Sequence, residues 1–467
     1  DGGGSLPVDD VLTLAGVGSV IILRADDDVI FGAGGDVTVG ALSTAAFTIT
    51  ANLDGSGGSN QGAITMVDGT DINAGAGTIT MSASEDIAIG LVQTNNTSAT
   101  SISITTTRGA ITDADGSSGL DIDALTGEIT LSAVTGIGSG GALEITAGAL
   151  DITNTTSGNV LVTETDGLDV LGLSIGTGAA TSGTTTITSG SGTLDFKTGT
   201  LDVNNTGQFT ASGATVTISQ NMTVDGDVSI TASAAFSIAD TKTLTVAAGK
   251  DIVVQGTSAA LTGGLVATGA GDITVTATSG DITLNDNNEV SAIVATGTIS
   301  LTANSGTIIG DNDAVKDLEV TGAGAVTLAA KAIGPATATR ITIDANDTST
   351  LLTVDSNATT DGEDVNLVVA TGDFLAVTIT QLLAETDIDS TLAGSGDVID
   401  IDGRATEITI VDVDVDAGAT NLTYTLEQAS HNIAITTIDI GAGNLVITAT
   451  SGNITLPSSG AGIVGTT

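Results

Sequence analysis

The segment from Gly271 to Ala330 consists of short, similar phrases that recur at a nearly fixed interval. Three of them, GDITVTA, GTISLTA and GAVTLAA, begin at Gly271, Gly297 and Gly324, so the two intervals differ by a single position. Two further apolar runs follow each phrase, so one unit holds three short strands and three turns. Because a unit of this size cannot bury a core alone, it has to stack on its neighbours. The interval therefore predicts a solenoid.

Within each phrase, apolar residues alternate with polar ones. Ile273 and Val275 fall on one face of the expected strand, and Asp272 and Thr274 fall on the other. This period of two is typical of a half-buried strand. Turn positions such as Ser279-Gly280 carry residues that accept a positive φ. The predicted fold is all-β, a right-handed parallel β-helix with three strands and about 26 residues per coil.

The phrases recur along most of the chain, so we expect one continuous β-helix over residues 1–467. Residues 1–10 are expected to be a lead-in or cap, 340–440 less regular coils, and 458–467 a C-terminal tail. Because the chain opens at Asp1 without a Met, we expect a processed product or a segment of a longer protein. The last regular coil, from Asn444, has no obvious polar cap, and we expect it to stack on another coil or to continue.

Composition limits the classes of partner. The chain has 9 basic and 55 acidic residues, a formal net charge of −46, which excludes nucleic acid and anionic membranes as natural partners. There is no Cys, so neither disulfides nor thiolate metal sites are possible. No apolar run approaches the about 18 residues of a membrane-spanning helix, so no membrane insertion is predicted. The charge favours solubility, with a cation-binding surface as the alternative.

Aromatic side chains make up only 1% of the residues, which suits a narrow core of β-branched and small side chains. Phe209 and Phe236 are separated by about one coil, so we expect both rings in the interior.

Acidic strands are the best candidates for a ligand site. VIDIDG at Val398 and VDVDVDAG at Val411 place carboxylates on single strand faces, about 6.8 Å apart, with the next coil about 4.8 Å away. Carboxylates this close repel one another, and a Ca²⁺ ion would relieve the repulsion. The glycine-rich nonapeptide of Ca²⁺-binding β-rolls is absent, so a solvated acidic face is the alternative. The candidate Ca²⁺ ligands, which include two oxygen-rich loops, are Asp286, Glu289, Asp311, Asp313, Asp400, Asp402, Asp412, Asp414 and Asp416.

Nothing in the sequence predicts catalysis. Carbohydrate-cleaving β-helices need paired carboxylates in a cleft, basic residues beside them and aromatic platforms for the sugar. The arginines of this chain are scattered, and it has one tyrosine and one histidine, at Arg24, Arg108, Arg340, Arg404, Tyr424 and His431. We therefore predict no catalytic residues and a protein that is not an enzyme.

The phrase G-D/T-I-T-L-T-A-x-S-G-x-I, which covers most of the chain, resembles the repeats of filamentous-haemagglutinin-like exoproteins of two-partner secretion and the passenger domains of autotransporters. The resemblance implies a bacterial β-helix, extracellular or on the cell surface. The expected function is structural: a β-helical rod that associates end to end into a surface fibre, filament or sheath. The alternative is an adhesin stalk that presents loops such as Leu53 to Gln61 to a glycan or host receptor.

Overall fold

The computed structural model describes residues 4–344, with gaps at 15–17, 19, 41–43, 53–61, 117–118, 177–182, 286–290, 312–315 and 336–338. Beyond residue 344 it describes strands, mostly as backbone, with side chains at 352–355 and 367. The chain divides into two compact units, Asp1–Ser229 and Ile230–Thr467, and each is described by itself.

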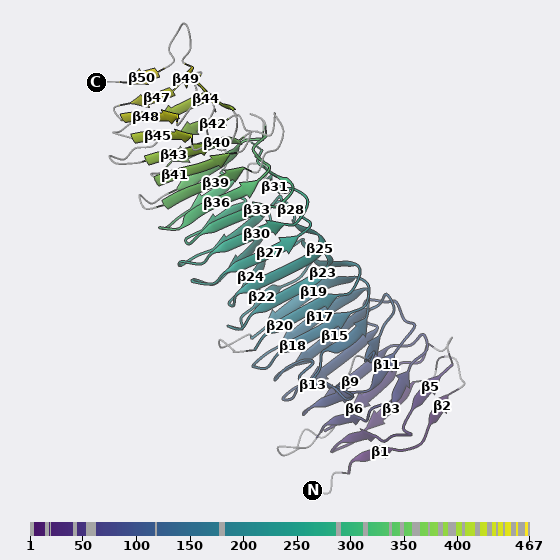
Figure 1. The fold of residues 1–467 in the computed structure, drawn as a ribbon. Helices are drawn as coiled ribbons and strands as arrows, with labels where there is room; N and C mark the ends of the chain where they lie inside the picture. Colours follow the sequence, from purple (N-terminus) through teal and green to yellow (C-terminus); the bar gives the residue numbers. More distant parts are fainter. Residues whose placement is uncertain are drawn as a thin grey trace. The chain divides into compact units, whose positions relative to one another are not determined.

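The fold is all-β, and its strands stack in parallel as the coils of a β-solenoid (Figure 1). About 13 turns of about 24 residues each are formed. In the first unit, each strand of the first coil pairs with the equivalent strand of the second coil: β1 (Leu6–Val8) with β4 (Val29–Phe31), β2 (Leu12–Leu14) with β5 (Val37–Val39), and β3 (Ile21–Arg24) with β6 (Phe47–Thr50). The predicted parallel β-helix is thus confirmed.

The repeat segment of the second unit has the predicted three strands per coil. Its strands are β30 (Ile273–Ala277), β31 (Ile282–Leu284), β32 (Ile293–Ala295), β33 (Ile299–Ala303), β34 (Thr307–Ile309), β35 (Leu318–Val320) and β36 (Ala325–Ala330). Ile273 pairs with Ile299, and Ile299 pairs with Val326. The register of this segment is therefore the one that its phrases predict.

Elsewhere the coils differ in length, and the average coil of about 24 residues is slightly shorter than those of the repeat segment. A long coil separates Phe47 from its partner Ile79, whereas a much shorter one separates Ile129 from its partner Leu150. The pairing constrains only the strands, and the turns between them absorb the difference.

Glycine at the start of a phrase has a steric cause. A Cβ on Gly324 would overlap the backbone carbonyl oxygen of Gly297, which begins the same phrase one coil earlier. A Cβ on Gly77 would overlap the carbonyl oxygen of Ala45 in the same way. Only glycine lets consecutive coils approach this closely at the turn.

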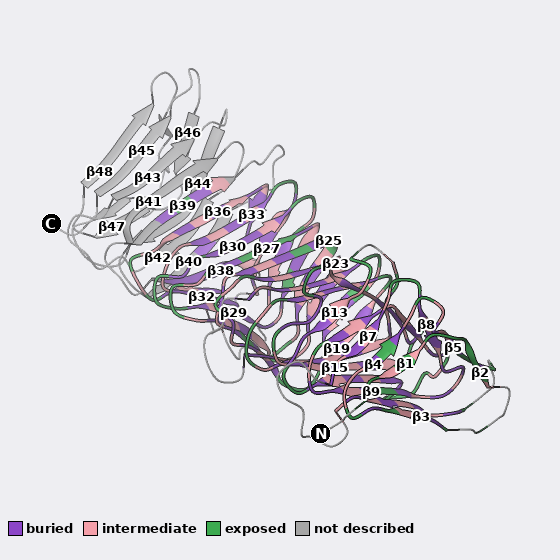
Figure 2. Cartoon of the chain, turned by 90° about the horizontal axis from the view of Figure 1, so that it is seen from below, coloured by how far each residue is buried: buried purple, intermediate pink, exposed green. Residues whose placement is uncertain are grey.

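Inward-facing side chains form the core along each unit, and outward-facing ones are half-buried or exposed (Figure 2). In β30, Ile273, Val275 and Ala277 are buried and the residues between them are half-buried, as the alternation predicts. The rings of Phe209 and Phe236 are fully buried, which confirms their predicted place in the interior. The ring that contacts Phe209 is that of Phe196, edge to face, with centroids 5.7 Å apart.

The strands beyond residue 344 are less evenly registered. Pairing shifts register between β39 (Thr350–Ser356) and β41 (Phe374–Gln381), and between β42 (Thr386–Ser390) and β44 (Glu407–Val415). The chain from Phe374 to Gln381 is a strand, in agreement with its Val and Thr content.

Candidate functional site

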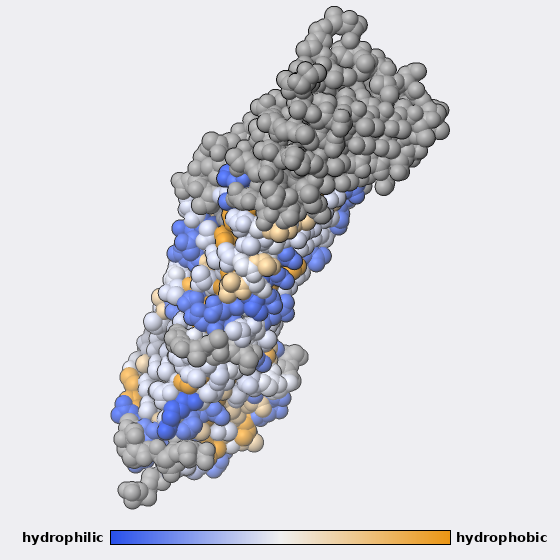
Figure 3. All heavy atoms as spheres, turned by 90° about the vertical axis from the view of Figure 1, so that its left-hand side faces the viewer, coloured by the Kyte–Doolittle hydropathy of each residue, from blue (hydrophilic) through white to orange (hydrophobic). Residues whose placement is uncertain are grey.

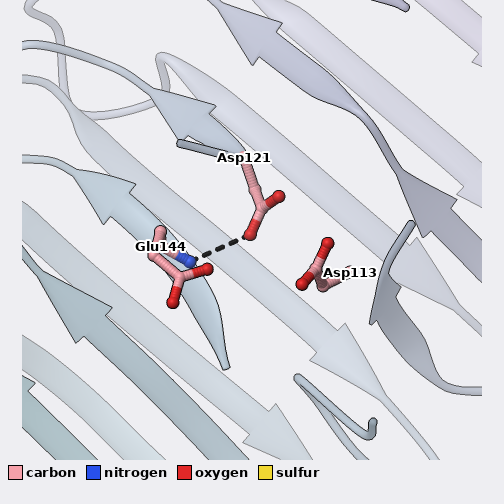
Figure 4. A group of neighbouring side chains, drawn as sticks. All are labelled: Asp113, Asp121 and Glu144. Atoms are coloured by element: carbon pink, nitrogen blue, oxygen red, sulfur yellow. Dashed lines mark hydrogen bonds between the residues drawn. The ribbon is translucent and has the colours of Figure 1, made fainter. Parts of the chain in front are cut away.

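Three carboxyl groups from different strands meet in the first unit (Figure 4). Asp113 ends β13 (Ile111–Asp113), Asp121 precedes β14 (Ile122–Asp123), and Glu144 lies in β16 (Leu143–Thr146). One carboxylate oxygen from each residue lies within 4.8 Å of the other two. We call these three residues the acidic cluster.

The acidic cluster is poorly supplied with hydrogen-bond donors. Asp121, 2% exposed, accepts a hydrogen bond at Oδ2 from the backbone N–H of Glu144, at 2.9 Å. Asp113 accepts hydrogen bonds from the backbone N–H groups of Asp115, at Oδ1, and of Gly116. The Oδ2 atom of Asp113 and the Oε2 atom of Glu144 are buried and accept none. Buried oxygens without donors favour the protonated, neutral form of a carboxyl group.

Burial raises the pKa of Asp121 to about 8, and the carboxyl groups of Asp113, Glu144 and Asp115 contribute to the rise, against the hydrogen bond from Glu144. Burial also raises the pKa of Asp113 and of Glu144. At neutral pH the acidic cluster therefore holds at least one proton. Hard cations also bind clustered carboxylates, but proximity alone identifies no ion, and we assign none.

A fourth carboxyl group lies inside the next coil. Glu164 ends β18 (Val160–Glu164) and is fully buried. In register it follows Ile122 and Ile145 and precedes Ser189, so it occupies an inward position that is apolar in the two coils before it. Its Oε2 accepts a hydrogen bond from the N–H of Asp166 at 2.9 Å, and its Oε1 accepts none. Burial raises the pKa of Glu164 to about 7.

A surface hollow of about 170 Å³ adjoins the acidic cluster and is lined partly by Asp68, Asp71 and Asp115. Gln93 donates through Nε2 to both carboxylate oxygens of Asp71, at 2.7 and 2.8 Å. The carboxylate of Asp71 thus already has a protein partner.

The hydrogen bond from Glu144 to Asp121 belongs to a pattern that recurs along both units. An Asp or Asn stands one residue before a strand, and its side chain accepts a hydrogen bond from the backbone N–H of its register partner one coil later. We call this contact the coil staple. Acceptors of this kind among the described residues include Asp28, Asp36, Asp86, Asp121, Asn159, Asp251, Asp272, Asp281 and Asp317.

The coil staple explains why Asp so often precedes Ile in the repeated phrase. Asp272 accepts from the N–H of Thr298 at 2.6 Å, and their neighbours Ile273 and Ile299 are paired in the ladder. The donor N–H lies at or within one or two residues of the start of its strand, and the side-chain oxygen supplies the acceptor that this N–H needs. Part of the acidic charge, which the sequence suggested serves solubility, therefore joins successive coils.

We expect Asp28→Ala to loosen the second and third coils, because Asp28 Oδ1 accepts from the N–H groups of both Gly62 and Ala63, each at 2.9 Å. Losing an ionised acceptor for two donors should cost about 2 kcal/mol. The amides of Gly62 and Ala63 should then exchange with solvent deuterium about 30-fold faster. Asp28→Asn keeps an acceptor oxygen and is the matched control. Equal exchange rates in Asp28→Ala and wild type would contradict the coil staple.

The predicted calcium ligands are only partly within the described residues. Asp400 and Asp402 lie in β43 (Val398–Gly403), and Asp412 and Asp414 lie in β44. Asp311, half-buried, follows β34. Asp286, Glu289, Asp313 and Asp416 lie outside the described residues.

Backbone register brings other aspartates beside two of these. Asp387 pairs with Asp412. Asp389 pairs with Asp414, and Asp414 pairs with Asp439, so one column holds an aspartate in three successive coils. This column was not predicted, because the candidates were grouped along single strands, and Asp389 and Asp439 stand in otherwise dissimilar phrases. Calcium binding at these residues remains a prediction.

The acidic cluster was also missed. Its members stand in three different strand phrases, and no single stretch of sequence contains them together. The usable signal was Asp121-Ile122, an Asp before an inward Ile, as in Asp272-Ile273.

Comparisons with known proteins give no match. No protein-family model matches the chain, and neither a curated protein nor a solved structure matches it. Among the described residues, no helix has the length and apolar character needed to cross a membrane.

Proposed function

We propose that the chain is an extracellular structural protein, a β-helical rod that associates end to end into a surface fibre or sheath. The observation that carries this proposal is an apolar, partly unpaired surface at the first coil. Of the eight large hydrophobic side chains that are exposed among the described residues, four lie in the first coil, Val11, Leu12, Val20 and Ile22, and a fifth, Ile30, lies on β4 of the second coil.

Backbone pairing supports the same surface. The described partners of β1, β2 and β3 are β4, β5 and β6, all in the second coil. The opposite edges of β2 and β3 therefore still offer N–H and C=O groups to a further parallel strand. Pro7 in β1 has no N–H to offer, so β1 contributes less to such pairing.

We name a second copy of the chain as the partner of this surface. The strands β48 (Asn444–Ala449), β49 (Ile454–Thr455) and β50 (Ile463–Gly465) have β45 (Asn421–Leu426), β46 (Asn432–Ile435) and β47 (Ile438–Gly441) as their described partners. The edges of β48, β49 and β50 that face away from these partners resemble those of the first coil, because each set consists of three parallel strands. Small orange patches interrupt the blue and white surface in Figure 3, including near the end that carries the first strands.

Electron microscopy of the purified chain tests the proposal. Wild type should form long, uniform fibres, and Val20→Lys with Ile22→Lys should give short particles, since lysines at the start of β3 oppose the pairing of its free edge with a further strand. Val253→Lys is the matched control, because Val253 is 45% exposed on β27 (Ile252–Gly256). Fibres that persist in the double variant, or a wild type that stays monomeric, would refute end-to-end association through the first coil. Loss of the fibres when a chelator is added would indicate that Ca²⁺ also stabilises the junction.

One observation favours the adhesin alternative. The coil that runs from Phe47 to its partner Ile79 is longer than the coils on either side of it. Those neighbours run from Ile21 to Phe47 and from Ile79 to Ile102. The long coil includes residues 53–61, which were predicted to form a presented loop. A monomeric chain that binds a glycan array, and loses the binding when 53–61 is shortened, would support a stalk that presents this loop.

A further inference from the structure

We propose that Asp113, Asp121, Glu144 and Glu164 form a proton-operated latch, which keeps β14, β16 and β18 paired while the carboxyl groups are protonated and loosens this pairing when they ionise. The latch is independent of the proposed fibre. It is a property of three successive coils within the first unit.

Geometry is the first argument. Three carboxylate oxygens within 4.8 Å of one another, on the buried Asp121 and the half-buried Asp113 and Glu144, repel one another strongly when all three groups are ionised. Glu164 lies on the opposite face of the same strands, since it pairs with the inward-facing Ile145, whereas Glu144, the residue before Ile145, faces outward. Asp121 before β14, Glu144 in β16 and Glu164 in β18 therefore place carboxyl groups on both faces of three successive paired strands, and Asp113 of β13 joins the outer group.

Within the described residues, no basic side chain compensates the charge. The charged groups that act on the acidic cluster from outside it are acidic: Asp115 acts on all three members. Glu164 has Asp166 as its charged neighbour. The ion pairs of the described part of this unit join other residues, Arg108 to Glu85 and Lys197 to Asp169. Ionisation of these four carboxyl groups would thus be opposed by the acidic groups beside them.

Three buried oxygens that accept no hydrogen bond connect the ionisation of the carboxyl groups with the separation of the strands. Asp113 Oδ2, Glu144 Oε2 and Glu164 Oε1 are buried and accept no hydrogen bond. A neutral carboxyl group tolerates this, but an ionised one needs donors at both oxygens. Water is the available donor, and it reaches these buried atoms when the paired strands separate. Burial places the titration range at about pH 7 for Glu164 and about pH 8 for Asp121. Above this range, β14, β16 and β18 should separate more often.

Hydrogen exchange at several pH values, corrected for the intrinsic pH dependence of amide exchange, tests the latch. In wild type, the protection factors of β14, β16 and β18 should fall at least about tenfold between about pH 5 and about pH 9. The double variant Asp121→Asn with Glu164→Gln has no titrating group at these two positions, so its protection should change far less. Asp272→Asn, which alters a coil staple at an exposed residue of the second unit, is the matched control and should behave as wild type.

A second measurement on wild type guards against a variant that does not fold. The infrared carbonyl band of protonated carboxyl groups should persist at about pH 6, where an exposed Asp or Glu is ionised. Protection that is constant with pH, or the absence of that band, would overturn the latch. Millimolar Ca²⁺ that restores protection in wild type at about pH 9 would also overturn it, because the strands would then be held together by a cation rather than by protons.

Discussion

Replacing Phe209 with Ala is expected to destabilise the first unit by about 3–5 kcal/mol, the usual cost of removing a buried aromatic ring. The ring of Phe209 is fully buried and meets that of Phe196 edge to face, with an interplanar angle of 64°. Truncation removes this contact and leaves a cavity between two coils. Because a solenoid is stabilised coil by coil, the loss should be largest for the coils that hold the two rings.

Chemical denaturation combined with hydrogen exchange measures this effect. The denaturation midpoint of the first unit should fall, and exchange should accelerate most in β20 (Thr185–Ser189), β21 (Thr193–Phe196) and β23 (Phe209–Ile218). Phe209→Leu, which keeps most of the volume, should cost about 1–2 kcal/mol and serves as the control. An Ala variant as stable as the Leu variant would show that the ring contact contributes little.

The second large effect is on pH dependence: the folded chain should resist urea better at about pH 5 than at about pH 9. Burial raises the pKa of Asp121 from 3.8 to about 8 and that of Glu164 from 4.5 to about 7. For an acid with a raised pKa, the folded state binds more protons than the unfolded state between the two pKa values. Stability is therefore highest at low pH, declines as pH rises through this window, and stays low above the folded-state pKa.

At about 1.4 kcal/mol per pKa unit, Glu164 alone should account for roughly 3 kcal/mol. The other carboxyl groups with a raised pKa, Asp71 and Glu128 among them, act in the same direction. So does the net charge of −46, because self-repulsion grows as more carboxyl groups ionise.

Urea midpoints measured across this pH range test the sign. Glu164→Gln should flatten the curve and raise the midpoint at about pH 9, since a neutral amide replaces a buried charge. A midpoint that rises with pH in wild type would contradict the assignment of these carboxyl groups as buried and protonated.

Sequence reasoning succeeded where repetition was regular. The phrases at Gly271, Gly297 and Gly324 predicted both the strands and their register, because a fixed interval leaves one way to align them. It did not predict the unequal coils elsewhere, since turns of different length lie between strands that still pair. The acidic cluster depends on such a turn: Asp113 and Asp121 flank it, and Glu144 joins them from the next coil.

The meaning of the acidic residues was likewise only partly predictable. Composition shows that the chain is acidic, but not that Asp272 accepts the N–H of Thr298 or that Glu164 faces inward. The first is a contact between successive coils, which an alternating pattern does not encode. The second follows from the alternation of Val160, Val162 and Glu164, but the sequence does not show that one oxygen of this buried carboxyl group accepts no hydrogen bond.

The coil staple has a consequence for how such a chain can change over generations. Each staple joins a coil only to the next one, and it sits at the start of a strand rather than in the turn. Insertions and deletions in a turn can thus leave the contact intact, and coils as unequal as those that begin at Phe47 and at Ile79 still pair in parallel. A gene for this protein is therefore expected to gain or lose residues, or to accept a foreign peptide, in turns that no closely packed glycine constrains.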